Sequence, residues 1–482
     1  MRAHLTPGLR DQFDQLTQAR SELVARLYAP AGPRTDADRT AVTAARAQID
    51  ELESVLSAAS ADFRTQVESV TLAKIQAVLP ASAALVEFVR YRRVDPRQAK
   101  PWQEERYLAY LLTAHGPPQW VALGEAAPID KAVDAVLAAM DGRISAATEK
   151  AALRHLDTLV FAPIRAQLSG VSHVILAPDG KLNLVPFEAL IDPQGHYALE
   201  RYRMSYVSSG RDLVRFASLQ TPRASAVIIA GPDYGPLPSS LGSLSFLPLG
   251  GAAAEANDLR RYFPTAPVTG ANATKDALAA LTGPDVLHIA THGFYGWSAG
   301  VTAAATRSAD RVAPLDPLRT GVVGFAMPPP SPRDPAEDLD QSGLAMADAN
   351  RGPKGLVTAR EIAGFDWWGT QLVVLSACQT GVGAVSSGDG VYGLRRALVL
   401  AGAASQVVSL WKVSDWATRA LMRDYYGELK NGIGRAEALR QAKLRMLHQP
   451  ATAHPFYWAA FIPAGDWRPL DASVFSPWRI TP

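Results

Sequence analysis

The segment Gln371-Leu-Val-Val-Leu-Ser-Ala-Cys378-Gln-Thr-Gly381 combines a continuous apolar run with an abrupt polar end. Such a run predicts a strand that is buried on both faces, as in a parallel sheet. The strand ends in small residues, and the thiol of Cys378 is the reactive side chain offered at its end. Because Cys378 is the only cysteine of the chain, an internal disulfide and a cysteine metal cluster are both excluded.

A second apolar run, further upstream, ends in the same way. It reads Asp285-Val-Leu-His-Ile-Ala-Thr-His292-Gly293-Phe294 and stops at a histidine that is followed by glycine. A thiol with an unperturbed pKa of about 8.5 is only a few per cent thiolate at pH 7, so a catalytic cysteine needs a base within reach. One strand end with an imidazole and one with a thiol therefore predict a catalytic pair of His292 and Cys378.

Several motifs of the chain resemble the CHAT-domain family. They are His292-Gly293, Ser376-Ala-Cys-Gln-Thr-Gly381, Gly388-Asp-Gly-Val-Tyr-Gly-Leu-Arg-Arg-Ala-Leu398, Ala177-Pro-Asp-Gly-Lys-Leu-Asn-Leu-Val-Pro-Phe-Glu-Ala-Leu190, Phe246-Leu-Pro-Leu-Gly-Gly-Ala252 and His454-Pro-Phe-Tyr-Trp-Ala-Ala-Phe461. The resemblance covers roughly residues 80 to 468. The family comprises bacterial relatives of caspases, separase and gingipains, which are grouped as caspase-like (clan CD) cysteine peptidases.

The resemblance implies a cysteine endopeptidase in which Cys378 is the nucleophile and His292 is the general base and then the general acid. It also implies that the backbone amides of Gly293 and Cys378 form the oxyanion hole, that a thioester acyl-enzyme is formed, and that no metal or other cofactor takes part. Glycine suits this place because it lacks a Cβ and lets the backbone approach a substrate carbonyl closely. The residues do not identify a third group that would orient His292.

The composition favours a protein or peptide partner. The 48 lysine and arginine residues against 46 acidic ones leave a formal net charge of +2, which is too small to favour nucleic acid or an anionic membrane. The sequence contains no run of 18 apolar residues and no apolar signal core, so we expect no membrane insertion. A lone cysteine suits a reducing compartment, so we expect a cytoplasmic protein. The resemblance adds an activating or sensor protein as a second partner.

Hydrophobic periodicity divides the chain into three parts. Residues 1–78 carry apolar residues at helical spacing and predict a helical hairpin, which either caps the body or docks a partner. Residues 79–222 alternate β-type runs with helices but contain no Ala-Cys pair, and in the relatives such a layer is a pseudo-protease half. Residues 223–482 predict the catalytic half. The expected fold class is therefore α/β, with a caspase-like, mainly parallel sheet flanked by helices.

A segment rich in Pro, Ala, Asp and Gly separates the histidine run from the cysteine run, from Trp297 to Gly355. Its composition and length predict a long, partly mobile loop. Placed between base and nucleophile, this loop is expected to cover the cleft until a partner or a cleavage moves it.

Further along the chain, a strand is predicted at Tyr457–Ile462.

The segment Ser405-Gln-Val-Val-Ser-Leu-Trp411 predicts a strand that ends beside the catalytic pair. An extended peptide adds to such a strand at an open edge by main-chain hydrogen bonds, and the corresponding segment of the caspase relatives does so. The expected substrate-binding residues are Ser409, Leu410, Trp411 and Asp415. The carboxylate of Asp415 would favour a basic P1 side chain, whereas Lys412 nearby would neutralise it or favour an acidic one.

Less specific interpretations stay open beside these. A buried cysteine is also compatible with a small hydrophobic role, and His288 is more typical of a hydrogen-bonded core histidine. A metal site at His288 and His292 lacks further ligands at suitable spacing. Two other functions remain as alternatives: a catalytically silent scaffold that uses the fold to bind proteins, and an acyltransferase that uses the same dyad with an amine as acceptor.

Overall fold

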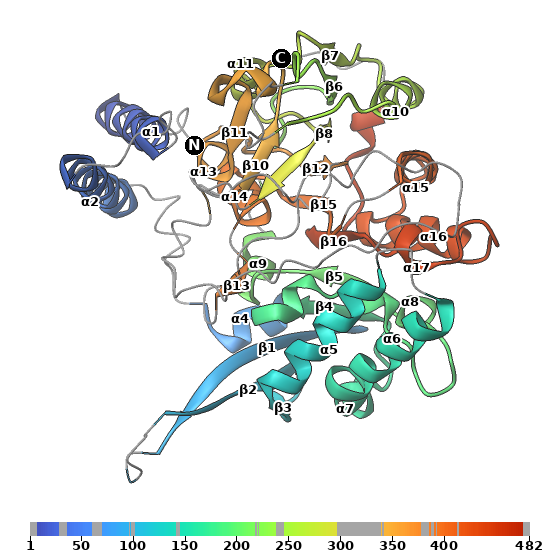
Figure 1. Ribbon diagram of the computed structural model, residues 1–482. Helices are drawn as coiled ribbons and strands as arrows, with labels where there is room; N and C mark the ends of the chain where they lie inside the picture. Colours follow the sequence, from blue (N-terminus) through green and yellow to red (C-terminus); the bar gives the residue numbers. More distant parts are fainter. Residues whose placement is uncertain are drawn as a thin grey trace.

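The computed structural model describes residues 7–27, 36–59, 70–95, 97, 102–140, 145–216, 219, 221–237, 245–295, 339, 342–376, 385–386, 390–391, 393–411 and 414–475. Its largest sheet has 11 strands in the order β3-β2-β1-β4-β5-β16-β15-β12-β8-β6-β7 (Figure 1). The strands are β1 (Ala83–Val94), β2 (Trp102–Thr113), β3 (Gln119–Glu125), β4 (His173–Ala177), β5 (Arg203–Tyr206), β6 (Val227–Pro232), β7 (Val268–Gly270), β8 (Val286–Ala290), β12 (Leu372–Leu375), β15 (Ser405–Ser409) and β16 (Phe461–Gly465).

Most neighbouring strands of this sheet are parallel, as predicted. The antiparallel neighbours are β1 with β2, β2 with β3, and β15 with β16. All residues of β4, β8, β12 and β15 are buried, because helices cover both faces of the sheet there. This burial explains why the two strands that lead to the predicted catalytic pair read as continuous apolar runs.

The sheet continues through both α/β halves of the chain. β16, which comes last in the sequence, lies in the middle and pairs with β5 on one side and β15 on the other. Because β16 is parallel to β5 and antiparallel to β15, the strands of the two halves run in opposite directions. The carboxyl ends of β8 and β12 therefore lie at the opposite edge of the sheet from those of β4 and β5.

Helices pack on both faces of the sheet (Figure 1). In the second half, α10 (Ala252–Leu259), α15 (Asp415–Lys430) and α16 (Arg435–Leu447) lie on one face, and α13 (Ala359–Ala363) and α14 (Leu394–Ala401) lie on the other. In the first half, α5 (Ala126–Ala139) and α6 (Ala146–Val160) contribute to the main core, whereas α4 (Leu72–Val78) and α9 (Arg211–Arg215) pack around a smaller core on the other face. The remaining short helices are α7 (Ala162–Arg165), α8 (Ala198–Arg201), α11 (Lys275–Ala279) and α17 (Pro455–Trp458).

The predicted N-terminal hairpin is confirmed. α1 (Pro7–Leu27) packs along α2 (Asp36–Ala59) through a small core of Leu16, Ala19, Leu23 and Ile49. α1 also contacts α13, so the hairpin lies against the second half of the body. Residues 60–69, which follow α2, lie outside the described residues.

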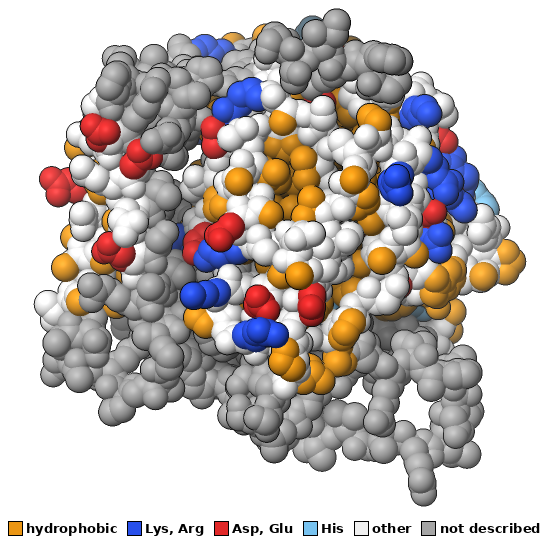
Figure 2. Space-filling model, turned by 90° about the horizontal axis from the view of Figure 1, so that it is seen from above, with side chains coloured by type: hydrophobic (Ala, Val, Ile, Leu, Met, Phe, Trp, Pro, Cys, Tyr) orange, Lys and Arg blue, Asp and Glu red, His pale blue; other side chains and the backbone are white. Residues whose placement is uncertain are grey.

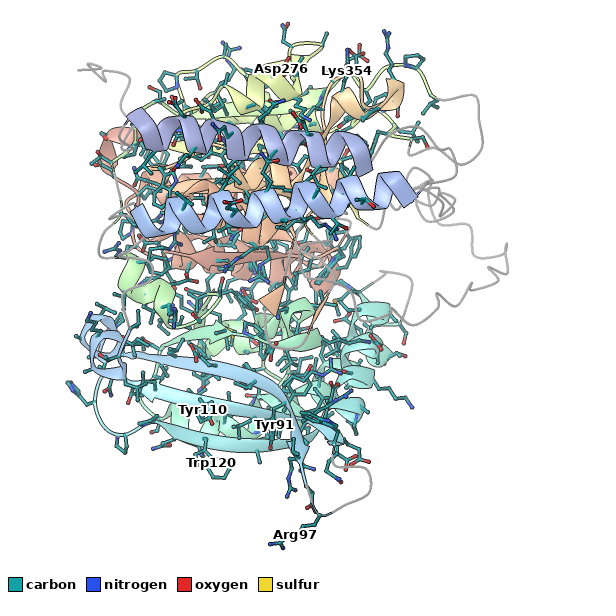
Figure 3. All side chains as sticks on the ribbon, turned by 90° about the vertical axis from the view of Figure 1, so that its left-hand side faces the viewer. Tyr91, Arg97, Tyr110, Trp120, Asp276 and Lys354 are labelled. Carbon is teal, nitrogen blue, oxygen red and sulfur yellow. The ribbon has the colours of Figure 1, made fainter. Side chains whose placement is uncertain are left out.

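The outer face of β1, β2 and β3 carries aromatic side chains. Tyr110 on β2 is the cross-strand neighbour of Trp120 on β3, and they are 44% and 64% exposed. Figure 3 shows these two residues, with Tyr91 of β1, on the face that is turned toward the viewer. The opposite face of the same strands packs through Phe88, Ala109 and Leu111 into the main core.

Two predicted segments differ from the structure. The prediction of a loop from Trp297 to Gly355 was wrong at its end, because β10 (Ser342–Ala345) forms a three-stranded sheet with β9 (Gly293–Tyr295) and β11 (Leu356–Thr358). Residues 297–338, 340 and 341 of that segment lie outside the described residues. The strand predicted at Tyr457–Ile462 begins only at Phe461, since Pro455 starts the short helix α17 in front of it.

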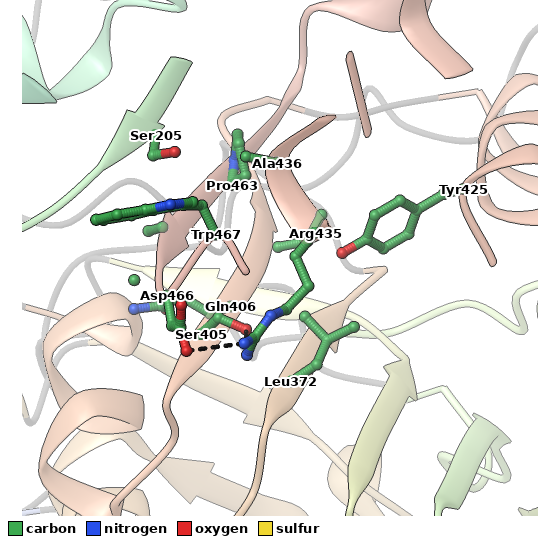
Figure 4. Close-up of a pocket in the computed structure, with 13 residues that line it drawn as sticks. Ser205, Leu372, Ser405, Gln406, Tyr425, Arg435, Ala436, Pro463, Asp466 and Trp467 are labelled. Atoms are coloured by element: carbon green, nitrogen blue, oxygen red, sulfur yellow. Dashed lines mark hydrogen bonds and ion pairs between the residues drawn. The ribbon is translucent and has the colours of Figure 1, made fainter. Parts of the chain in front are cut away.

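A small cavity lies where β5, β15 and β16 meet (Figure 4). Its lining includes Ser205, Gln406, Tyr425 and the ion pair between Arg435 and Asp466. The cavity has room for about one water molecule. It is too small for a peptide side chain, and it lies at the start of β15 rather than at the strand end expected to meet substrate.

Candidate active site

The candidate catalytic residues follow two adjacent strands. β8 and β12 are parallel neighbours, and Leu375 lies in register with Ile289. His292 follows Ile289 by three residues, and Cys378 follows Leu375 by three residues. Because the carboxyl ends of parallel strands meet at one edge of a sheet, the two segments leave the sheet at the same edge. Of the pair, His292 is described and Cys378 lies outside the described residues.

The backbone at His292 is held by β10. The amide of Ala345 donates a hydrogen bond to the carbonyl of His292 at 2.9 Å. The buried hydroxyl of Thr291 donates to the carbonyl of Ala345, and it lies 3.0 Å from the hydroxyl of Tyr234. A strand inside the predicted loop therefore contributes directly to the position of the candidate base.

The imidazole of His292 has a defined orientation. Its Nε2 lies 2.8 Å from the carbonyl oxygen of Leu247. The ring packs against Tyr234 and Phe246, with centroids 5.2 and 5.8 Å away. A carbonyl oxygen only accepts, so Nε2 carries the proton and the lone pair of the neutral ring lies on Nδ1. The Leu247 carbonyl is thus the orienting group that the sequence did not identify, because a backbone oxygen leaves no residue signature.

The segment that carries Leu247 is fixed on both sides. Asn350 accepts a hydrogen bond from the amide of Phe246 at 2.8 Å and donates one to its carbonyl at 2.9 Å. At the other end, the amide of Gly251 donates to Oδ2 of Asp415 at 3.0 Å. A Cβ on residue 251 would lie 2.6 Å from the Cβ of Asp415, so this close approach requires glycine.

The amide of Gly293 points away from β10. In an antiparallel pair, residues alternate between hydrogen-bonded and non-hydrogen-bonded positions. The Ala345 amide bonds the carbonyl of His292, so the next pair, Gly293 with Leu344, occupies a non-hydrogen-bonded position. The N–H of Gly293 is therefore directed to the side of β9 that β10 does not occupy. This orientation suits a donor to a substrate oxyanion.

A buried polar chain lies beneath the site. His288 is fully buried; its Nδ1 lies 3.0 Å from the hydroxyl of Tyr426, and its Nε2 lies 3.1 Å from Oε1 of Glu255. The hydroxyl of Ser376 donates to the other oxygen of Glu255 at 3.1 Å. Burial, together with the nearby Tyr425 and Glu255, raises the pKa of Tyr426 well above its usual value, so this phenol stays neutral. The interpretation of His288 as a hydrogen-bonded core histidine is confirmed.

The expectation of an open edge along Ser405–Leu410 was wrong. β15 pairs with β12 on one side and with β16 on the other, and the amide of Leu410 donates to the carbonyl of Ala460. Ser409 and Leu410 are buried. A substrate strand cannot add to β15 itself, because both of its edges already carry protein partners; a peptide has access only to the chain beyond it.

Trp411 and Asp415 lie beyond the end of β15. The indole of Trp411 is largely buried and donates to the carbonyl of Phe456 at 3.2 Å. Asp415 begins α15, is exposed, and uses one carboxylate oxygen for the Gly251 amide. The predicted P1 selector therefore also supports the segment that orients His292. Lys412, named with it, lies outside the described residues.

Charges of both signs are mixed on the surface around α10, α11, β6 and β7. Figure 2 shows hydrophobic side chains gathered in the middle of this face, with acidic and basic side chains interspersed around them. Within the described ranges, no group of three or more His, Cys, Asp or Glu side chains is arranged to hold a metal ion. The same residues include no helix with the length and apolarity needed to cross a bilayer.

Comparison with known structures finds distant similarity. A chain from the crystal structure of the Saccharomyces cerevisiae separase–securin complex aligns with a TM-score of 0.46 at 9% identity, covering 94% of this chain and 36% of that one. The Arg-specific cysteine proteinase gingipain R aligns with a TM-score of 0.36 at 10% identity, covering 71% of this chain and 74% of that one.

Comparison with known sequences gives a family. Tetratricopeptide repeat protein 28 of Homo sapiens is 29% identical over 348 residues, and that of Mus musculus is 28% identical over 352 residues. The alignments cover 68% of this chain but only 13% and 14% of those relatives, so the chain spans a small part of their length. The CHAT domain model matches residues 150–466, which is well over half of the sequence. The chain therefore belongs to the CHAT domain family.

Proposed function

We propose that this protein is a caspase-like cysteine endopeptidase with His292 and Cys378 as its catalytic dyad. The observation that carries the proposal is the register of β8 and β12, in which Ile289 and Leu375 are paired and each stands three residues before a member of the dyad. The orientation of the His292 ring by the Leu247 carbonyl adds a group that a catalytic base requires and a merely structural surface histidine does not.

The chemistry follows from the tautomer of His292. With the proton on Nε2, the lone pair on Nδ1 accepts the proton of the Cys378 thiol, and the thiolate attacks the peptide carbonyl. The amides of Gly293 and Cys378 stabilise the oxyanion that forms. The imidazolium then protonates the leaving amine, which gives a thioester, and water activated by the same ring releases the acid product. No metal or other cofactor is required for these steps.

The substrate in this proposal is an extended peptide of a specific protein partner. Because the edges of β15 are paired, the peptide backbone meets the chain at and beyond Trp411, while Ser409 and Leu410 support that segment from the buried end of the strand. The exposed carboxylate of Asp415 favours a basic P1 side chain. Residues 79–222 serve as the non-catalytic, pseudo-protease half.

Labelling with a peptide acyloxymethyl ketone tests the proposal. The chain has one thiol, so the labelled position is unambiguous. We expect a single adduct on Cys378 in the folded protein and strongly slowed labelling in His292→Ala. Equal labelling rates in the two proteins would show that His292 does not activate the thiol.

A second candidate is a scaffold of the same fold that binds proteins without cleaving them. It is favoured by the relatives, which are named as tetratricopeptide repeat proteins and of which the chain covers only a small part. In either function we propose a cytoplasmic protein that works with an activating or sensor protein. If the protein is a scaffold, the wild type cleaves no peptide, and partner binding survives in Cys378→Ala. If it is an acyltransferase, the acyl group is transferred to an added amine in preference to water.

A further inference from the structure

The end of β12 is attached to α10 by a buried hydrogen bond. Ser376 Oγ donates to Glu255 Oε2 at 3.1 Å, and the two residues are 9% and 5% exposed. Ser376 is the last described residue before Cys378, and only Ala377 separates them in the sequence. Because an extended chain spans at most about 3.6 Å per residue, the Cα of Cys378 can lie no farther than about 7 Å from that of Ser376.

Glu255 also has a second buried neighbour. Its other oxygen lies 3.1 Å from Nε2 of His288, and His288 contacts the hydroxyl of Tyr426 through Nδ1. His288 lies on β8, four residues before His292, and Tyr426 lies on α15. Both are fully buried, so solvent does not weaken these contacts.

The segment that leads into α10 also contacts the base. The segment just before α10 contains Leu247, whose carbonyl binds His292, and α10 begins after Gly251, whose amide binds Asp415. One short stretch, from Leu247 to Glu255, therefore contacts the base at one end and the strand end before the nucleophile at the other. Glu255 lies in the first turn of α10, which begins at Ala252, so this stretch joins the loop that contacts the base to the start of the helix.

We propose that Glu255 is a positioning residue that, through Ser376 and with the support of His288, sets the place of Cys378 relative to His292. The inference rests on the proposed peptidase function and adds to it the element that couples the two halves of the dyad. Glu255 does not touch substrate; it acts through the Ser376 hydroxyl. A misplacement of reacting groups by about 1 Å can cost about a hundredfold in rate, so the effect is measurable.

Three substitutions separate this role from general stability. Ser376→Ala removes only the hydroxyl. Glu255→Ala removes the acceptor and leaves His288 without its neighbour. Glu255→Gln keeps an oxygen to accept from Ser376 and places an amide that can donate to Nε2 of His288. The matched control is Glu149→Ala, which breaks a similar contact in the first half, where Nε2 of His454 lies 2.6 Å from the buried carboxylate of Glu149.

For peptide cleavage measured per folded molecule, we expect kcat to fall about tenfold in Ser376→Ala and about a hundredfold in Glu255→Ala, with KM nearly unchanged. Glu255→Gln should recover most of the loss. Because both residues act through one link, the double variant Ser376→Ala with Glu255→Ala should be no slower than Glu255→Ala alone. Glu149→Ala should lower stability but leave kcat unchanged.

The inference is overturned if Ser376→Ala keeps the wild-type kcat, or if Glu149→Ala lowers kcat as much as Glu255→Ala does. Alkylation of Cys378 by iodoacetamide gives a second readout that does not need peptide cleavage. If the wild type cleaves no peptide, the proposed function fails. The positioning role of Glu255 still stands in that case if Ser376→Ala changes the alkylation rate and Glu149→Ala does not. If neither variant changes the alkylation rate, the positioning role fails together with the function.

Discussion

Nε2 of His292 lies 2.8 Å from the carbonyl oxygen of Leu247, a residue 45 positions earlier in the sequence. This contact fixes the tautomer of the ring and, with Tyr234 and Phe246 beside it, its plane. A backbone carbonyl thus occupies the place that a carboxylate takes in a Ser-His-Asp triad. The group that orients the base is therefore neutral.

The two hydrogen bonds between Asn350 and Phe246 predict that a substitution outside the dyad lowers kcat. Asn350→Ala removes both hydrogen bonds to Phe246, so the Leu247 carbonyl loses its fixed position. We expect kcat for peptide cleavage to fall about tenfold with a small change in KM. Asn183→Ala is the matched control, because Asn183 is a buried asparagine that bonds the carbonyl of Gly180 in the first half. An unchanged kcat in Asn350→Ala would argue against the orienting role of Leu247.

Asp415 offers a test of substrate preference that keeps its structural contact. Asp415→Asn retains an oxygen for the Gly251 amide and loses the charge. A charge-assisted hydrogen bond to a basic P1 side chain contributes about 1.5 to 3 kcal/mol, so the preference for Arg or Lys should drop by roughly ten- to a hundredfold. A positional peptide library measured with both proteins reports this preference. If the preference for basic P1 residues survives in Asp415→Asn, another group selects P1.

His173 predicts an acid-dependent loss of stability. Burial, with a smaller contribution from Arg203, lowers the pKa of His173 to about 3, so the ring is neutral in the folded protein. The unfolded chain takes up the proton near pH 6.5, so the stability is fully present above pH 6.5 and is lost progressively as the pH falls toward 3. In His173→Gln, which can still bond Ser205, the free energy of unfolding should depend less on pH, by up to about 1.4 kcal/mol per pH unit.

Denaturant unfolding between pH 7.5 and pH 4.5 measures that dependence. His196→Gln serves as the control for replacing a histidine, because the His196 side chain is 64% exposed. Equal slopes in the wild type and His173→Gln would mean that His173 is not the group that titrates.

The buried pair of Arg435 and Asp466 predicts a large effect on stability. Their side chains are 2.8 Å apart and almost fully buried, and Arg435 also donates to the carbonyls of Gln371 and Arg468. Asp466→Asn leaves the guanidinium buried without its charge partner, which typically costs about 3 to 5 kcal/mol. Asp276→Asn, at an exposed helix start, should cost less than about 1 kcal/mol. Similar unfolding free energies for the two variants would contradict this account.

The carboxylate of Asp466 also makes the stability of the folded protein depend on pH. Burial alone would raise the pKa of Asp466, but the hydrogen bonds from Arg468 and the charge of Arg435 bring it below its ordinary value. The contribution of this carboxylate is therefore present above the pKa of an unfolded aspartate and is lost as the pH falls below it.

The parts of the fold that the sequence predicted are those with a periodic or continuous apolar signal. β8 and β12 are buried on both faces and read as uninterrupted apolar runs. The apolar residues at helical spacing in α2, among them Val42, Ala45 and Ile49, belong to the small core between α1 and α2. β9, β10 and β11 were missed because each has only three or four residues, and their pairing is decided by distant segments. β16 was placed too early because Pro455 starts a helical turn in front of it.

The candidate site was predictable to the extent that side chains define it. His292 and Gly293 follow from a strand end with a polar residue before glycine. His292 and the Leu247 carbonyl that orients it are 45 positions apart in the sequence, and Ser376 and its acceptor Glu255 are 121 positions apart. No local sequence pattern reveals such contacts. The paired edges of β15 depend on β16, which enters the sheet from the end of the chain.

The most direct test of the dyad is the rate of peptide hydrolysis by the wild type, Cys378→Ala and His292→Ala, with circular dichroism to show that each protein is folded. We predict that either substitution lowers the rate by several orders of magnitude while the spectra stay the same, because loss of one member of such a unit removes most of its catalysis. Hydrolysis at the wild-type rate by folded Cys378→Ala would contradict the assignment of Cys378 as the nucleophile.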